Sequence, residues 1–212
     1  MPVTAAKYCL RSAAPLAALL ALFWLTPAAP LRAFTNVVVD AGHGGHDRGG
    51  IPGQRIAEKT MALDVALRLE TLLKADNFGV VMTRDDDTFI PLLERPEISN
   101  RTPDAIFVSI HFDAFQASHA EGVTTIFWTS EGRDLAGAVH RQILAHLHPD
   151  VNRGIMRRPL AVLRHNRWPA ILVEGGYLTS PVDAAKILTP EYRQSLAAAI
   201  ADGILDYGKL DR

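Results

Sequence analysis

Cysteine is nearly absent from this chain: one occurs in 212 residues, at Cys9. Cys9 lies in the N-terminal segment, residues 1–33, so residues 34–212 contain no thiol. That part of the chain can form no disulfide and can offer no thiolate to a metal. Any metal site in residues 34–212 must therefore be built from histidine, aspartate and glutamate side chains.

An excess of basic residues is also lacking. The formal net charge is −1, and residues 1–33 hold three of the 22 basic residues and none of the 23 acidic ones. Residues 34–212 therefore carry 19 basic and 23 acidic residues, a net charge of −4. Proteins that bind nucleic acid normally present a basic face, so we expect no nucleic-acid partner.

A hydrophobic run long enough to span a bilayer is missing as well. The apolar run at residues 13–25 has about 13 residues, whereas a permanent span needs roughly 20. Lys7 and Arg11 precede the run, and residues 26–33 are rich in proline and small side chains. This layout predicts a signal peptide at residues 1–33 and an exported domain at residues 34–212. Because residues 31–33 match a cleavage site only in part, a retained N-terminal anchor stays as the alternative; cleavage would leave no stable membrane insertion.

Strand-like and helical patterns alternate from residue 36 onward. The strand-like runs are continuously apolar rather than alternating, which indicates a sheet buried on both faces. We therefore expect an α/β fold: a single domain with a mostly parallel twisted sheet and helices on both faces. The expected strands are residues 36–39, 78–83, 105–110, 123–128, 160–163 and 170–173, and the expected helices are residues 58–74, 91–100, 133–147 and 191–207.

The first expected strand runs into a glycine-rich turn that carries His43 and His46. Glycines after a strand can hold a phosphate, whereas a histidine among them suggests a metal. The phosphate interpretation is disfavoured, because no helix begins directly after the turn and no GKS or GKT signature is present. His46 is expected to be a solvated loop residue, since a fourth protein ligand would close the position that a catalytic water needs.

Two more expected strands lead into a side chain that can do chemistry. His111 follows residues 105–110, and Glu174 follows residues 170–173. Carboxyl ends of parallel strands share one edge of a sheet, so residues 131 positions apart in sequence can meet there. Glu58 begins the first expected helix near the same edge. Two histidines and a carboxylate with one open position form a catalytic zinc site, and a second carboxylate can act as general base.

On five segments the chain resembles the zinc-dependent N-acetylmuramoyl-L-alanine amidases, family three of the cell-wall amidases. The segments occur in order as VVVDAGHGG, IAEKTMALDVALRL, VMTRDDDTFIPLLER, DAIFVSIHFDA and PAILVEGGYLTSP, and the resemblance covers roughly residues 36–207. It implies zinc on His43, Glu58 and His111, with Glu174 as the catalytic carboxylate. It also implies hydrolysis of the amide between the lactyl group of N-acetylmuramic acid and the L-alanine of the stem peptide.

The chain departs from the family pattern at two places. Residues 112–113 are Phe-Asp where the family usually has Ala-Asn, and residues 179–180 are Thr-Ser where it usually has Ser-Asn. Neither change touches a proposed ligand or the base, so both are expected to affect the floor of the substrate groove. Asp40 and Asp113 are candidates for orienting the imidazoles, with a turn-forming role as the alternative. For Arg95, pairing with an acidic side chain is expected in preference to binding a peptide carboxylate.

These observations predict an exported peptidoglycan hydrolase, periplasmic or associated with the cell wall, with peptidoglycan as its partner and any activator protein unidentified. Two other functions stay open. One is a zinc peptidase or deacylase that acts on small muramyl peptides. The other is a catalytically inactive wall-binding protein.

Overall fold

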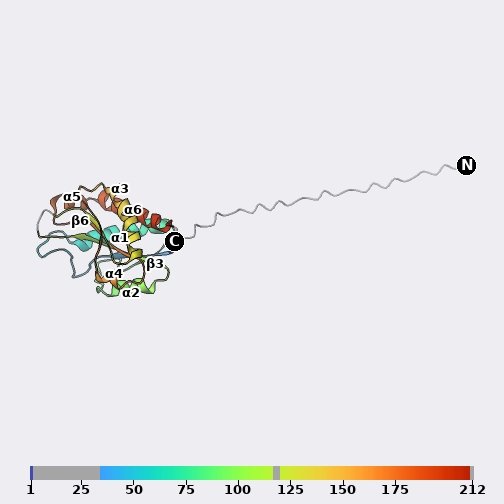
Figure 1. Ribbon diagram of the computed structural model, residues 1–212, viewed down its shortest axis with the longest axis horizontal. Helices are drawn as coiled ribbons and strands as arrows, with labels where there is room; N and C mark the ends of the chain where they lie inside the picture. Colours follow the sequence, from blue (N-terminus) through green and yellow to red (C-terminus); the bar gives the residue numbers. More distant parts are fainter. Residues whose placement is uncertain (2–33, 117–119, 211–212) are drawn as a thin grey trace. The chain divides into compact units, whose positions relative to one another are not determined.

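The computed structural model describes residue 1, residues 34–116 and residues 120–210 (Figure 1). Apart from Met1, the signal segment predicted at residues 1–33 lies outside the described residues, so it stays a prediction. In the described part of the chain, no helix has both the length and the hydrophobicity that a bilayer span requires.

Six strands form one sheet in the order β2-β1-β3-β6-β4-β5. Neighbouring strands in the group β2, β1, β3 and β6 are parallel, β4 is antiparallel to β6, and β5 is parallel to β4. Four strands therefore run one way and two the other, which confirms the predicted mostly parallel sheet. The strands are β1 (Asn36–Ala41), β2 (Gly79–Met82), β3 (Ala105–Asp113), β4 (Val123–Phe127), β5 (Asn152–Arg157) and β6 (Ala170–Tyr177).

Helices cover both faces of this sheet, as predicted. Three long helices, α1, α3 and α6, pack over one face and enclose the larger hydrophobic core. The short helices α2 and α4 lie over the other face, with a smaller core beneath them. The helices are α1 (Glu58–Ala75), α2 (Glu94–Arg101), α3 (Ser130–Leu147), α4 (Ala161–Arg164), α5 (Pro181–Ile187) and α6 (Pro190–Gly208).

Helix α1 shows why the sequence pattern was informative. Ala62, Val65, Leu69 and Leu73 recur at spacings of three and four, and all are fully buried against the sheet. The first residue of this helix, Glu58, is also buried, with 4% of its surface exposed. The packing of α1 thus buries a carboxylate near the carboxyl ends of the parallel strands.

The prediction of a strand at residues 160–163 was wrong. Residues Ala161–Arg164 form α4, and the strand in this region is β5, which was not predicted. A four-residue apolar run does not distinguish a strand from a buried helical turn. Here Val162 and Leu163 pack as a helical turn into the smaller core. Strand β5 lies at the edge of the sheet and is polar, so it lacks the apolar run expected of a buried strand.

Several other boundaries also differ from expectation. Strands β3 and β6 continue to Asp113 and Tyr177, so His111 and Glu174 lie within strands rather than after them. Helix α2 begins at Glu94, which places Pro96 in its first turn. A first-turn N–H has no partner inside the helix, so proline is tolerated there. Helix α5 was not predicted.

Candidate metal centre

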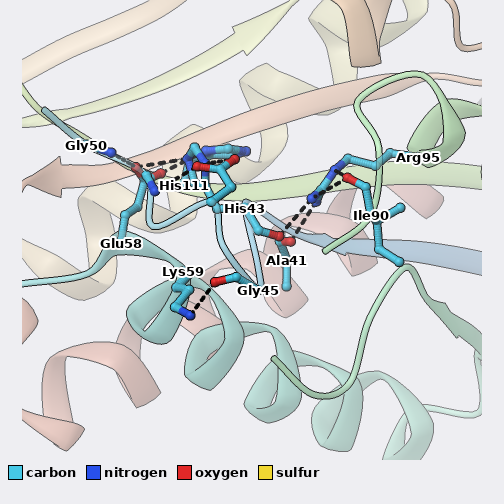
Figure 2. Close-up of polar contacts among 12 residues, drawn as sticks. Ala41, His43, Gly45, Gly50, Glu58, Lys59, Ile90, Arg95 and His111 are labelled. Carbon is cyan, nitrogen blue, oxygen red and sulfur yellow. Dashed lines mark hydrogen bonds and ion pairs between the residues drawn. The ribbon is translucent and has the colours of Figure 1, made fainter. Parts of the chain in front are cut away.

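His43 lies in the loop that follows β1, and two buried arginines hold the backbone around it. Arg84 donates to the carbonyls of Ala41 (2.9 Å) and Gly42 (2.6 Å). Arg95 donates to the carbonyls of Ala41 (2.8 Å) and His43 (2.7 Å), as Figure 2 shows in part. His43 itself has a φ of 61°, a left-handed conformation that is uncommon outside glycine. These two guanidinium groups stabilise a turn that positions the His43 ring over the end of the sheet.

Three predicted ligands come together here, although the first and the last are 68 positions apart in the sequence. The Nε2 atom of His43 lies 3.0 Å from Oε2 of Glu58, and Nδ1 of His111 lies 2.8 Å from Oε1 of the same carboxylate. The two imidazole rings meet edge to face, with centroids 4.8 Å apart. Figure 2 shows the carboxylate of Glu58 beside both rings.

Glu58 is held in place by backbone N–H groups as well. Gly50 donates to Oε2 and Phe112 donates to Oε1, each at 3.0 Å. Burial raises the pKa of this carboxyl, but hydrogen bonds from His111 and His43 outweigh it and lower the pKa of Glu58 to about 2. A buried carboxylate that stays charged near neutral pH is a suitable ligand for a divalent cation.

Two glycines leave the room that these side chains occupy. A Cβ on Gly42 would lie 2.4 to 2.7 Å from three atoms of the His111 ring. A Cβ on Gly49 would lie 2.5 Å from Oε2 of Glu58 and 2.6 Å from Cδ2 of His43, and the φ of Gly49 is +68°. The glycine-rich loop therefore serves close packing around the imidazoles.

Among the described residues, His43, Glu58 and His111 form the group of histidine and acidic side chains that could hold a metal ion. Their ligand atoms all lie within 4.8 Å of one another. The donor set of two imidazoles and one charged carboxylate suits zinc, and about a fifth of each histidine side chain is exposed, so solvent can reach the site. The residues present therefore fit such an ion.

Glu174 lies beside this group without belonging to it. In the sheet register it is the partner of His111. Its Oε2 atom is buried and has no hydrogen-bond partner among the described residues. Burial raises the pKa of Glu174 well above its ordinary value, and the charges of Glu58 and Asp113 add to this effect. A carboxyl of this kind can exchange a proton at a higher pH than an exposed glutamate.

Asp47 contacts the candidate site but was not predicted. Its Oδ2 atom lies 2.8 Å from Nδ1 of His43. Burial lowers the pKa of His43, but the hydrogen bonds and charges of Glu58 and Asp47 outweigh it, so that the pKa lies above the ordinary value. The available signal was an aspartate four residues after a histidine in a loop, which is common and therefore weak.

The other candidate residues have different roles. Asp40 is fully buried and accepts hydrogen bonds from Thr83, Ser109 and Arg95. Its carboxylate therefore stabilises the interior of the protein rather than orienting an imidazole. The expected pairing of Arg95 with an acid is confirmed by this 2.8 Å contact with Asp40. His46 is exposed, as expected, and its ring packs on Phe89 at 4.2 Å between centroids.

Two hollows adjoin the candidate site, and both are lined in part by His43, Asp47 and Phe89. One has a volume of about 670 Å³ and lies along the loop at residues 46–54. The other has a volume of about 370 Å³; His111 lines it together with apolar residues that include Leu160 and Leu172. A ligand larger than a single residue could therefore approach the imidazoles.

Known proteins are similar to this chain in sequence and in fold. A probable cell wall amidase LytH from Staphylococcus epidermidis is 35% identical over 185 residues, covering 84% of this chain and 60% of the relative. The chain thus spans about 60% of the length of that curated relative. The crystal structure of an N-acetylmuramoyl-L-alanine amidase from Clostridium difficile 630 is 34% identical, with a TM-score of 0.77, covering 82% of this chain and 97% of that one.

A further solved structure is the CwlD amidase from Clostridioides difficile in complex with the GerS lipoprotein. It has a TM-score of 0.78 and 26% identity, and the match covers 84% of this chain and all of that one. The family model described as N-acetylmuramoyl-L-alanine amidase matches residues 37–206, from β1 into α6. Since this match includes every residue of the candidate site, the chain belongs to the N-acetylmuramoyl-L-alanine amidase family.

Proposed function

We propose that this chain is an exported zinc-dependent amidase that hydrolyses the bond between N-acetylmuramic acid and the L-alanine of the peptidoglycan stem peptide. The observation that carries the proposal is the meeting of His43, Glu58 and His111 with Glu174 at their side. Family membership supports the same reaction, and curated relatives such as LytH bear the name of cell wall amidases.

In this proposal His43, Glu58 and His111 hold zinc. Zinc supplies a Lewis acid for the scissile carbonyl and makes a water molecule more acidic at neutral pH. Two histidines and a glutamate are a set of three protein ligands of the kind that catalytic zinc sites use. The hydrogen bonds from Gly50 and Phe112 fix the Glu58 carboxylate, so that the ligand is already oriented before an ion arrives.

Glu174 acts as the catalytic carboxylate. Its unpartnered Oε2 takes a proton from the attacking water and passes it to the amide nitrogen of the leaving alanine. The carbonyl carbon gains the water oxygen, the C–N bond breaks, and the products are a lactyl carboxylate and a free amine. A raised pKa suits both halves of this transfer, because Glu174 must hold the proton between the two steps.

Export and location form a second part of the proposal. The basic, apolar and small-residue order of residues 1–33 supports a signal peptide that directs residues 34–212 to the periplasm or the cell wall. The substrate is found there. The CwlD amidase was solved in complex with a lipoprotein, which supports a partner protein for this chain as well.

Digestion of purified sacculi tests the proposal. The purified protein should contain about one zinc ion per chain, and mass spectrometry of the digest should find free stem peptides that begin with L-alanine. Chelation should abolish release, and added zinc should restore it. Release from small muramyl peptides alone would favour the peptidase or deacylase alternative. Retention on sacculi without any release would favour the inactive wall-binding protein.

A further inference from the structure

The side chain of Asp47 joins His43 to its own loop. Its Oδ2 atom lies 2.8 Å from Nδ1 of His43, and its Oδ1 atom accepts the N–H of Gly49 at 3.0 Å. The backbone of Asp47 also forms a pair of hydrogen bonds with Gly44, at 3.0 and 3.1 Å. Both carboxylate oxygens are therefore engaged, and one of them contacts a candidate metal ligand on the side away from Glu58.

A neutral imidazole carries one proton, on Nδ1 or on Nε2, and only the nitrogen without it can bind a metal. A carboxylate next to Nδ1 favours the proton at that nitrogen. Glu58 Oε2 lies 3.0 Å from Nε2 on the other side of the ring, so Nε2 is the nitrogen beside the second candidate ligand. Asp47 thus holds the Nδ1 side of the ring, and a cation that binds Nε2 would leave the ring proton on Nδ1, where Asp47 accepts its hydrogen bond.

His43 needs this support more than His111 does. His111 belongs to the central strand β3, and its ring packs against Gly42 at the position that a Cβ would fill. His43 belongs to a loop, has a φ of 61°, and carries its ring at the rim of two hollows. Packing orients one ring, whereas a hydrogen bond from the loop orients the other.

We propose that Asp47 is a positioning residue that fixes the ring orientation of His43 for metal binding, by accepting a hydrogen bond from Nδ1 while Nε2 faces the site. The inference rests on the proposed function, since it assumes that His43 is a ligand. Loss of a carboxylate that backs a metal-binding histidine typically weakens metal affinity by about 10- to 100-fold.

Asp47→Asn and Asp47→Ala test this role, with Asp87→Asn as the matched control. Asp87 anchors the same loop, because its carboxylate accepts the N–H of Gly45 and pairs with Lys59, but it does not touch an imidazole. Asn keeps the size of Asp, so Asp47→Asn preserves the fold if Asp47→Ala does not. All variants keep the backbone hydrogen bonds between residues 44 and 47.

The first measurement is zinc affinity by competition with a chelator. We expect the zinc affinity of both Asp47 variants to fall by about 10- to 100-fold, with that of Asp87→Asn unchanged. The second measurement is the NMR resonance of the His43 Nδ1 proton in zinc-loaded protein. A hydrogen bond to a carboxylate is short and moves this resonance downfield, so it should move upfield in Asp47→Asn and stay in place in Asp87→Asn. A purely structural role of Asp47 would not move this resonance.

Equal zinc affinity and the same Nδ1 proton resonance in wild type and Asp47→Asn would overturn the inference. An equal loss of affinity in Asp87→Asn would also overturn it, because general loosening of the loop would then be the cause. Failure of the proposed function has a different signature: the wild-type chain would bind no zinc.

Discussion

Glu174 on β6 and His111 on β3 are register partners on adjacent parallel strands. Side chains at paired positions project from the same face of a sheet, so a carboxylate and an imidazole stand side by side. The two carboxylates of the candidate site therefore have different surroundings, which matches their different proposed roles as metal ligand and general base. Glu58 lies between the two histidines, whereas Glu174 approaches from the sheet and keeps one oxygen without a partner among the described residues.

Glu174→Gln should remove activity without removing the metal. We expect the rate of peptide release to fall by about 10²- to 10⁴-fold, the usual contribution of a general acid–base group. Zinc content should stay at the wild-type level, because the three ligand atoms belong to other residues. The measurements are kcat on sacculi and metal analysis of the same sample. Near-normal kcat in this variant would remove Glu174 from the mechanism.

Asp113→Asn should shift the pH profile of the reaction. The negative charge of Asp113 contributes to the raised pKa of Glu174, after burial and Glu58. Asparagine removes that charge, so the pKa of Glu174 should fall. A general base works in its deprotonated form, so the acidic limb of kcat/KM should move to lower pH. Asparagine is also the usual family residue at this position.

The control for this variant is Asp104→Asn, whose carboxylate accepts a hydrogen bond from Thr35. Its acidic limb should coincide with that of the wild type. A limb that stays fixed in Asp113→Asn, or that moves to higher pH, would contradict the effect of Asp113 on the catalytic carboxylate.

Gly49→Ala should weaken zinc binding, whereas Gly53→Ala should not. Both glycines have a positive φ, +68° and +82°, so alanine costs roughly 1–2 kcal/mol of backbone strain at either site. Only at Gly49 would the new Cβ collide with Glu58 and His43; at Gly53 nothing lies within 4 Å. Thermal unfolding should report the shared strain, and chelator competition the difference. Equal zinc affinities would show that the loop can move away from the ligands.

Arg95→Met should destabilise the fold strongly. The guanidinium of Arg95 pairs with Asp40, which is fully buried, and methionine would leave that carboxylate without its cation. Breaking a buried ion pair by removing one partner costs about 3–5 kcal/mol in the free energy of unfolding. Urea denaturation measures the loss.

Arg101→Met is the control for this prediction. Arg101 lies 3.7 Å from Glu97, and both side chains are more than 60% exposed. A surface pair of this kind contributes no more than about 1 kcal/mol, so the urea midpoint should hardly change. Similar losses in the two variants would argue against the buried network around Asp40.

The meeting of the candidate ligands could be predicted from sequence because strong local patterns locate the elements that carry them. Continuous apolar runs locate β1, β3 and β6, and the helical periodicity after Glu58 locates α1. Parallel strands then bring their ends together, so the meeting of His43, Glu58 and His111 follows from topology. Glu174 joins them for the same reason.

Features that depend on tertiary contacts could not be predicted in this way. The polar edge strand β5 leaves no apolar signature, and the fold of residues 160–163 depends on the small core that receives Val162 and Leu163. Asp40 and Asp47 are both aspartates close to His43 in sequence, but one points into the core and the other contacts the ring. The conformation of the loop decides which of them reaches the imidazole.

His111 and Glu174 lie on β3 and β6, His43 follows β1 directly, and these three strands are neighbours in the middle of the sheet; Glu58 begins α1. Local unfolding of an outermost strand, β2 or β5, leaves the four side chains together. Separation of β3 from β6 moves the four side chains apart, so a bound ion would stabilise the protein against that separation. Cation binding should therefore slow amide hydrogen exchange most in the three middle strands, and much less at the two outermost ones.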